Sequence, residues 1–387
     1  MLNLEFINAT MAALSLNQAA LAVQCNVSRE AVSNWLSGEA LPRPSKLKAL
    51  AAALGVEVSR LTTSRLPEPI VAYRTKKNHA ATGPALIAAV ESAHQLRQLV
   101  PFVRGESLFS PAFLEKPRTD NDYVRMVTQQ IRRRIGLSST APVTREQILE
   151  LHHGFGSILV PVHWAGDKGG HENALSVYLP ESKLSWVVFS LNARNDDFNY
   201  WLTHELAHCY TLHAMSGDDG ETFAERFAQE LLFPHDAAVE AMDEFSAHED
   251  PMVRARYLAD AYNISIVTVI KQVERTAGLL GREIAGLQSE PFWNDWHETR
   301  TLVPTVAHAL FGTRHTSVEA YVENSERIFK TPIFKAIASW QHQEGGRSPA
   351  FIAAALNIAL EEAIDLSHLL MKRYPHQSVG AFSPNNC

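Results

Sequence analysis

The sequence has little cysteine, no long hydrophobic run and no excess of positive charge, and each shortage excludes a class of protein. Three cysteines among 387 residues do not make a disulfide framework, and they fit a reducing compartment. The longest apolar stretches, 49–56 and 351–360, are shorter than the about 20 residues that a membrane-spanning helix needs. The first residues lack the basic start of a signal peptide. We therefore expect a cytoplasmic protein without a membrane partner.

The acidic balance of the chain narrows its possible partners. A net charge of −7 excludes a uniformly basic nucleic-acid coat but leaves room for one small basic module. The hydrophobic share of 46% is ordinary for a soluble globular protein. The length is too great for one small core. No internal repeat is evident in the sequence.

The first 63 residues follow a helical pattern. Apolar residues recur at helical spacing in five short segments, Asn17 and Ser28 stand where N-caps belong, and Gly38 follows a helix end. The stretch 17–38 has the spacing of a helix-turn-helix, in which the second helix reads DNA. Side chains that can hydrogen-bond to bases or phosphates lie along it: Gln18, Ser28, Arg29, Glu30, Ser33 and Asn34.

This stretch resembles the XRE (Cro/C1-type) helix-turn-helix family, with Gln18 opening the first helix of the pair and a family-like ending at residues 54–58. The resemblance implies double-stranded operator DNA as a partner, and helix-turn-helix proteins often bind as homodimers. Residues 29–77 contain nine basic and four acidic residues, a local net charge of +5 that is compatible with phosphate contacts. A five-helix bundle used only for dimerisation or protein contact is the alternative.

The middle of the chain changes from helical to alternating spacing. Helices are expected at 85–99, 121–137 and 145–153, and strands at 157–162, 174–179 and 186–191, with a hairpin turn at 180–183. Two strong helices follow, at 197–214 and 221–233. The fold expected is mainly α with a small β-sheet (α+β). The expected domains are 1–64, a connector at 65–120, 121–235, and a helical domain at 236–387.

The first of these strong helices carries a HExxH motif. His204 and His208 are four residues apart, so on a helix they share one face and can bind one Zn²⁺ ion. Glu205 stands beside them and can take a proton from a metal-bound water. Glu221 and Glu225, one turn apart on the next helix, are both candidates for the third ligand, which would leave a fourth position for water.

From here the chain resembles the ImmA/IrrE family of zinc metallopeptidases, whose signature is HELxH followed by a helix of the form E-x-x-A-N-x-F-A-x-x-L-L-x-P. The chain has ETFAERFAQELLFP at 221–234, which registers Glu221 on the third-ligand glutamate and places Glu225 where the family has Asn. The resemblance implies a zincin-like core, Zn²⁺ held by His204, His208 and Glu221, and Glu205 as catalytic base. It also implies a repressor or antitoxin-like protein as substrate, in a stress or mobile-element response.

Several other interpretations accompany this one. A metzincin site is excluded, because Thr211 and Ala214 stand where that motif needs Gly and His. A coincidental HExxH is one alternative; others are a non-catalytic regulator that uses the zinc fold as sensor or scaffold, and the antitoxin half of a toxin–antitoxin pair. Cys209 is expected in the core, His213 at a helix end, and Arg132 to Arg134 at a solvated helix end. Residues 236–387 show no catalytic pattern, and the segment beginning at Ile264 resembles a degenerate helix-turn-helix.

Overall fold

The computed structural model divides the chain into two compact units, residues 1–68 and 69–387. The structure describes residues 2–37, 40, 42–62, 66–73, 84–103, 112–162, 174–247, 250–284, 287–313, 316–343 and 348–375. Gly38, expected at a helix end, lies outside them. Within the described residues, no single helix is long and apolar enough to cross a membrane. Helices α1 and α2, bent by 101° at their junction, would qualify together on length and composition alone.

The first unit contains four α-helices and one 3-10 helix among its described residues: α1 (Leu4–Ala13), α2 (Gln18–Cys25), α3 (Arg29–Ser37), α4 (Pro44–Leu54) and η1 (Val58–Leu61). The fifth expected helix is thus a single 3-10 turn. Apolar side chains from all five elements form one small core around Leu21, Val32 and Leu50. The expected N-caps are confirmed, because Asn17 accepts a hydrogen bond from the Ala20 amide and Ser28 accepts one from the Ala31 amide.

The second unit is built on a mixed sheet of four strands in the order β1-β3-β4-β2. The strands are β1 (Ile70–Tyr73), β2 (Ile158–Val162), β3 (Ala174–Leu179) and β4 (Leu184–Ser190). β3 pairs antiparallel with β1 and β4, and β2 pairs parallel with β4. The strands expected near 157–191 and their hairpin turn at 180–183 are confirmed. β1 was not expected, because residues 65–120 were interpreted as a connector.

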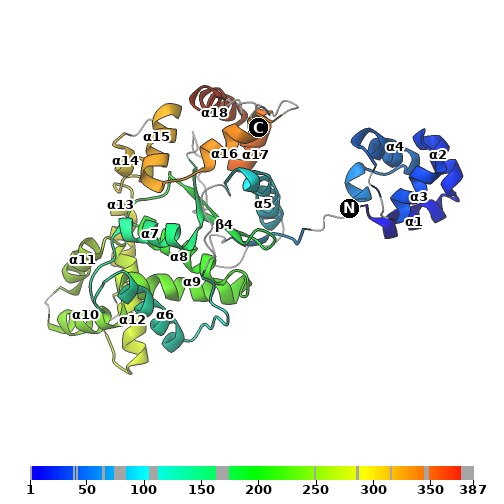
Figure 1. The fold of residues 1–387 in the computed structure, drawn as a ribbon. Helices are drawn as coiled ribbons and strands as arrows, with labels where there is room; N and C mark the ends of the chain where they lie inside the picture. The colour runs from blue at the N-terminus through cyan, green and yellow to red at the C-terminus, as the bar shows by residue number, and fades with distance from the viewer. Residues whose placement is uncertain are drawn as a thin grey trace, which may run out of the picture. The chain divides into compact units, whose positions relative to one another are not determined.

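Helices surround this sheet. Their bounds are α5 (Pro84–Val103), α6 (Asn121–Arg134), α7 (Arg145–Phe155), α8 (Phe198–Thr211), α9 (Gly217–Leu232), α10 (His235–Ala247), α11 (Pro251–Tyr262), α12 (Ile266–Leu279), α13 (Glu290–Arg300), α14 (Val306–Phe311), α15 (Val318–Phe329), α16 (Ile333–Gln341), α17 (Pro349–Leu356) and α18 (Leu360–Arg373). In the view of Figure 1, α9, α10 and α12 lie below the sheet and α15 to α18 above it. Segments expected as connector, peptidase domain and C-terminal domain share one hydrophobic core.

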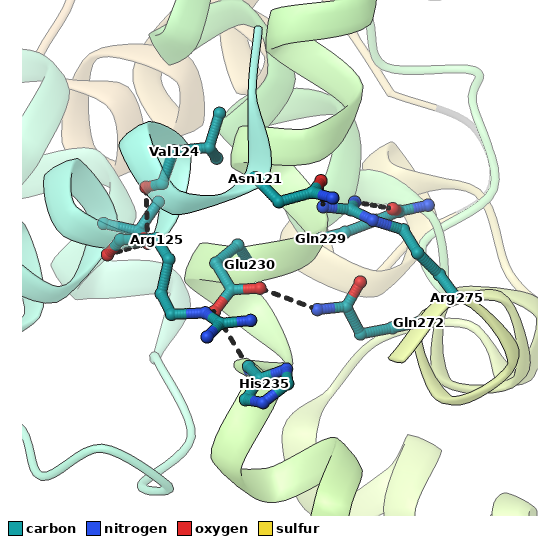
Figure 2. Close-up of polar contacts among 9 residues, drawn as sticks. Asn121, Val124, Arg125, Gln229, Glu230, His235, Gln272 and Arg275 are labelled. Carbon is teal, nitrogen blue, oxygen red and sulfur yellow. Dashed lines mark hydrogen bonds and ion pairs between the residues drawn. The ribbon is translucent and has the colours of Figure 1, made fainter. Parts of the chain in front are cut away.

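Buried polar groups fix the lower helices to one another. Glu230 on α9 accepts hydrogen bonds from the Gln272 side chain of α12, at 2.9 Å, and from the His235 amide, at 3.0 Å, as Figure 2 shows. The second bond places a carboxylate at the N-terminus of α10, where the helix dipole favours it. The guanidinium of Arg125 on α6 lies 3.8 Å from the same carboxylate. One acidic side chain therefore joins four helices next to the end of α9.

Arg132 corrects one expectation. It was assigned to a solvated helix end together with its two neighbours, and those neighbours, Arg133 and Arg134, are exposed. Arg132 itself is buried and donates hydrogen bonds to the carbonyls of Ser138, Ala141 and Leu231. The Leu231 carbonyl is one of the last on α9, where helical carbonyls lack intrahelical partners. A buried guanidinium is stable there because its donors are satisfied.

Three helix pairs share the same turn. Each pair has a left-handed asparagine between its helices: Asn26 (φ 51°, ψ 56°) between α2 and α3, Asn263 (φ 51°, ψ 51°) between α11 and α12, and Asn357 (φ 51°, ψ 43°) between α17 and α18. After each asparagine, the next amide bonds to a carbonyl five residues earlier. Asparagine tolerates this backbone region better than other non-glycine residues. The Asn263 turn directly precedes the segment at Ile264 that resembled a degenerate helix-turn-helix, whereas the same turn at Asn357 was not expected.

Candidate metal centre and nucleic-acid interface

Helices α8 and α9 bring three candidate ligands together. The Nε2 atoms of His204 and His208 lie 3.2 Å apart, and the Glu221 carboxylate oxygens lie 3.3 Å from the first and 3.4 Å from the second. All three side chains are buried. The residue pattern alone left the third ligand open between Glu221 and Glu225, and the family resemblance favoured Glu221. Among the described residues, it is Glu221 that joins the histidines in a cluster suited to a metal ion.

The spacing of these donor atoms fits one small cation. Ligand atoms about 2.0–2.1 Å from a tetrahedral zinc ion lie about 3.3 Å from one another. The three measured separations fall around that value. Burial tends to raise the pKa of the Glu221 carboxyl, but hydrogen bonds from His204 and His208 outweigh it and hold the pKa well below its ordinary range. The carboxylate is therefore ionised, as a metal ligand must be.

The local backbone explains why Glu221 reaches the histidines. α9 begins at Gly217, four residues earlier than expected, so Glu221 lies one turn inside the helix. Gly217 has a φ of +64°, which favours glycine. A Cβ on Gly220 would lie 3.3 Å from the Met215 carbonyl, so the chain between α8 and α9 packs closely against the start of α9.

Glu205 is oriented from the sheet. Its carboxylate accepts a 2.6 Å hydrogen bond from the hydroxyl of Ser176 on β3, and both residues are buried. On a helix, adjacent residues are about 100° apart, so Glu205 turns toward the sheet while its neighbour His204 turns toward α9. Ser176 was not among the residues predicted from the sequence. Its one available signal was a polar residue in a strand that is otherwise almost entirely apolar.

A buried histidine supports α8 from behind. His152 on α7 contacts the Leu202 carbonyl through Nε2 and the Ser157 hydroxyl through Nδ1, each at 2.8 Å. Burial lowers its pKa to about 4, although the hydrogen bond to the carbonyl of Leu202 acts in the opposite direction. His152 is therefore neutral in the folded protein, and it joins α7 to the HExxH helix. No local pattern in the sequence marks this histidine.

Two other residues near the motif lie where they were expected. Cys209 is buried in the core, where burial raises the pKa of its thiol. His213 follows the end of α8, and its ring packs against Phe113 and Tyr178. It is not one of the clustered donors.

Helix α3, the second helix of the α2–α3 pair, offers a polar surface. Arg29, Glu30 and Ser33 are exposed on α3, whereas Val32 and Trp35 are buried in the core of the unit. Ser28 is exposed at the N-cap, and Gln18 and Asn34 are half-buried. All six candidate contact residues are thus at least partly accessible. An α-helix with one apolar and one polar face suits insertion into the major groove.

Lys46, one of the nine basic residues counted between positions 29 and 77, has hydrogen-bond partners within the first unit. Its ammonium donates hydrogen bonds to the carbonyls of Cys25 and Asn26, at 3.2 and 2.9 Å. The lysine therefore holds α4 against the turn between α2 and α3. Four of the nine basic residues counted between positions 29 and 77, namely Arg65, Arg74, Lys76 and Lys77, lie outside the described residues. Arg29, Arg43 and Lys48 are exposed.

Comparison with known proteins bears on the first unit. Residues 8–61 match the helix-turn-helix family model, in its XRE type, and the match includes all of α2, α3, α4 and η1. It supports a DNA-binding transcription regulator with double-stranded DNA as its partner. No curated protein and no solved structure matches the chain.

Proposed function

We propose that this chain is a DNA-binding transcription regulator whose second unit is a zinc-dependent endopeptidase. The resemblance of the HExxH helix and of α9 to the ImmA/IrrE family supports this proposal. The observation that carries it is the convergence of His204, His208 and Glu221 beside Glu205. The proposed substrate is a repressor or antitoxin-like protein, and the proposed setting is a cytoplasmic stress or mobile-element response. A homodimer on two operator half-sites is part of the proposal.

The chain's own residues define the chemistry. His204, His208 and Glu221 would hold a Zn²⁺ ion, which supplies a water of lowered pKa and polarises the substrate carbonyl. The Glu205 carboxylate would accept a proton from the attacking water as the water oxygen bonds to the carbonyl carbon, and would return it to the leaving amine as the C–N bond breaks. Ser176 restrains that carboxylate by donating its hydroxyl hydrogen to Oε2. These are the roles that a hydrolytic site requires of its side chains.

Glu205→Gln tests the catalytic proposal. The amide cannot accept a proton, so we expect cleavage of candidate proteins encoded nearby to fall by about 10²- to 10⁴-fold. Bound zinc, measured by elemental analysis, should stay at one ion per chain, whereas His204→Ala should lose it. The matched control is Glu150→Gln, an exposed glutamate on α7. Undiminished cleavage in the Glu205 variant would refute the assigned base.

A non-catalytic regulator is the second candidate function. It is favoured by the position of the family match, which lies in the DNA-binding unit. In this case the metal cluster would serve as sensor or scaffold, as in an antitoxin-like partner. Glu205→Gln would then leave transcriptional output unchanged. Arg29→Ala and Asn34→Ala should weaken operator binding by about 1–3 kcal/mol each if they contact bases, as measured by titration of the promoter fragment.

A further inference from the structure

A cavity of about 600 Å³ lies next to the candidate metal centre. Four elements line it: α8, α9, α12 and α13. Its aromatic walls are Tyr200 and Trp201 from α8 and Trp293 and Trp296 from α13. Its lining therefore combines large aromatic surfaces with charged side chains, which is typical of a ligand site.

None of the candidate metal ligands lines the cavity, but residues close to them on both helices do. The ring of Trp201 lies 5.7 Å from that of His204, and the ring of Tyr200 lies 6.3 Å from it. On α9, Glu225 follows Glu221 by four residues, so the two glutamates share a face one turn apart. A peptide bound at the metal would therefore place a neighbouring side chain against Tyr200, Trp201 and Glu225.

The charges around the cavity are not equivalent. Asp197 and Arg300 pair with each other, and the Arg300 guanidinium also stacks at 4.6 Å from the centre of the Trp296 ring. Lys271, on α12, is exposed, so solvent screens its charge. Glu225 is half-buried among the aromatic walls. The Glu225 carboxylate, which lines the cavity with the aromatic rings, is therefore less screened by solvent than the Lys271 ammonium group.

We infer that this cavity is a substrate subsite for an arginine or lysine side chain beside the scissile bond. The inference rests on the proposed peptidase function. A guanidinium or ammonium group donates a charge-assisted hydrogen bond to a carboxylate and makes a cation–π contact with Trp or Tyr. An acidic side chain would instead be repelled by Glu225. Glu225 thus acts in specificity rather than as the third metal ligand.

Peptide binding to the zinc-loaded Glu205→Gln chain tests this inference without turnover. The probes are acetylated, amidated pentapeptides of alanine with arginine, citrulline or glutamate at the centre. We expect the arginine peptide to bind about tenfold more tightly than the citrulline peptide, since one charge-assisted hydrogen bond contributes about that factor. Adding Glu225→Gln should reduce the difference to about twofold or less, and adding Glu225→Lys should make the glutamate peptide the better ligand. Calorimetry reports these affinities.

Control variants distinguish loss of the subsite from misfolding and from failure of the peptidase proposal. Glu240→Gln, on the exposed side of α10, should keep the tenfold preference, and Trp293→Ala should weaken the arginine peptide. Equal binding of all three peptides, preference for glutamate in the parent, or no binding would overturn the subsite. If the arginine preference holds but the chain with Glu205 intact cleaves nothing, the endopeptidase proposal fails and the cavity remains a cation-binding site. If the chain cleaves its substrate with no preference for a basic side chain, the subsite fails and the endopeptidase proposal stands.

Discussion

The pairs α2–α3 and α11–α12 have nearly the same turn, but the second helix is exposed on one face in the first pair and covered in the second. Superposing Asn26 on Asn263 places Val32 on Val269, and both valines are buried. The same register places the exposed Ser33 on the buried Ile270 and the exposed Arg29 on the buried Ile266. α12 packs against α9, α10 and α11, so the face that α3 offers to solvent is covered.

This difference shows that the turn defines a way of packing two helices, whereas exposure decides whether the second helix can read DNA. The pair α17–α18 adds a third case. Its second helix presents the carboxylate of Asp365 to solvent at the position of Asn34. DNA phosphates would repel a carboxylate at the position where α3 offers an uncharged amide. Of the three described pairs, we therefore expect only α2–α3 to bind DNA.

An aspartate placed at corresponding positions of α3 and α12 gives the largest expected difference in stability. Ile270→Asp places an unpaired carboxylate in the core of the second unit, which should cost about 4 kcal/mol or more and unfold that unit. Ser33→Asp places the same carboxylate on the exposed face of α3, so stability should change by less than about 0.5 kcal/mol, while operator binding is lost. Thermal unfolding and promoter titration measure the two outcomes.

The outcome that contradicts this comparison is equally specific. If Ile270→Asp is tolerated, α12 is not the buried element that the structure describes. If Ser33→Asp leaves operator affinity unchanged, the exposed face of α3 does not approach the phosphates or bases.

The sequence predicted the elements whose patterns are local. Helical spacing and N-caps at Asn17 and Ser28 predicted the first unit, and apolar runs predicted β2 to β4. The HExxH motif placed two donors on one helical face, which the structure shows. Each of these features depends on residues close together in the chain, and a single sequence carries that information directly.

Features that depend on distant contacts were missed. β1 is four residues long and follows a segment with two prolines, and its hydrogen bonds come from pairing with β3 about a hundred residues later. Arg132 is buried because the carbonyls of Ser138, Ala141 and Leu231 surround it. Residue spacing alone did not choose between Glu221 and Glu225, because the choice depends on the packing of α9 against α8; only the family resemblance favoured Glu221. None of these contacts leaves a pattern in neighbouring residues.

Acid should lower the folding stability of the second unit more than that of the first, and this effect should be smaller than that of Ile270→Asp. The first 68 residues contain no histidine, whereas His152 is buried in the second unit with its pKa lowered to about 4. Below the ordinary pKa of about 6.5, the unfolded chain takes up a proton that the folded chain refuses, so stability falls as the pH falls from 6.5 toward 4. We expect His152 to account for about 2 kcal/mol of destabilisation between pH 7 and pH 5.

Hydrogen exchange resolved by peptide measures each unit in the intact chain. His152→Gln removes the titrating group, so the second unit should lose about 2 kcal/mol less stability than the parent between pH 7 and pH 5. His297→Gln, which changes an exposed histidine on α13, should behave as the parent does. An unchanged pH dependence in the His152 variant would show that other groups cause the acid sensitivity.

The shared turn itself should give the smallest effect, and an equal one in both units. Asn26→Ala and Asn263→Ala each place an alanine in the left-handed region, which should cost about 1 kcal/mol. Asn26→Gly and Asn263→Gly should restore stability, because glycine adopts that region freely. In both turns the asparagine carbonyl also accepts a side-chain hydrogen bond, from Lys46 in the first and from Asn199 in the second. These carbonyls survive every substitution, so the alanine variants isolate the backbone conformation. Denaturant unfolding of each unit, monitored by hydrogen exchange, should show the same loss of unfolding free energy for the alanine variant at both sites. Unequal losses would mean that the surroundings of α12, rather than the turn, stabilise the second pair.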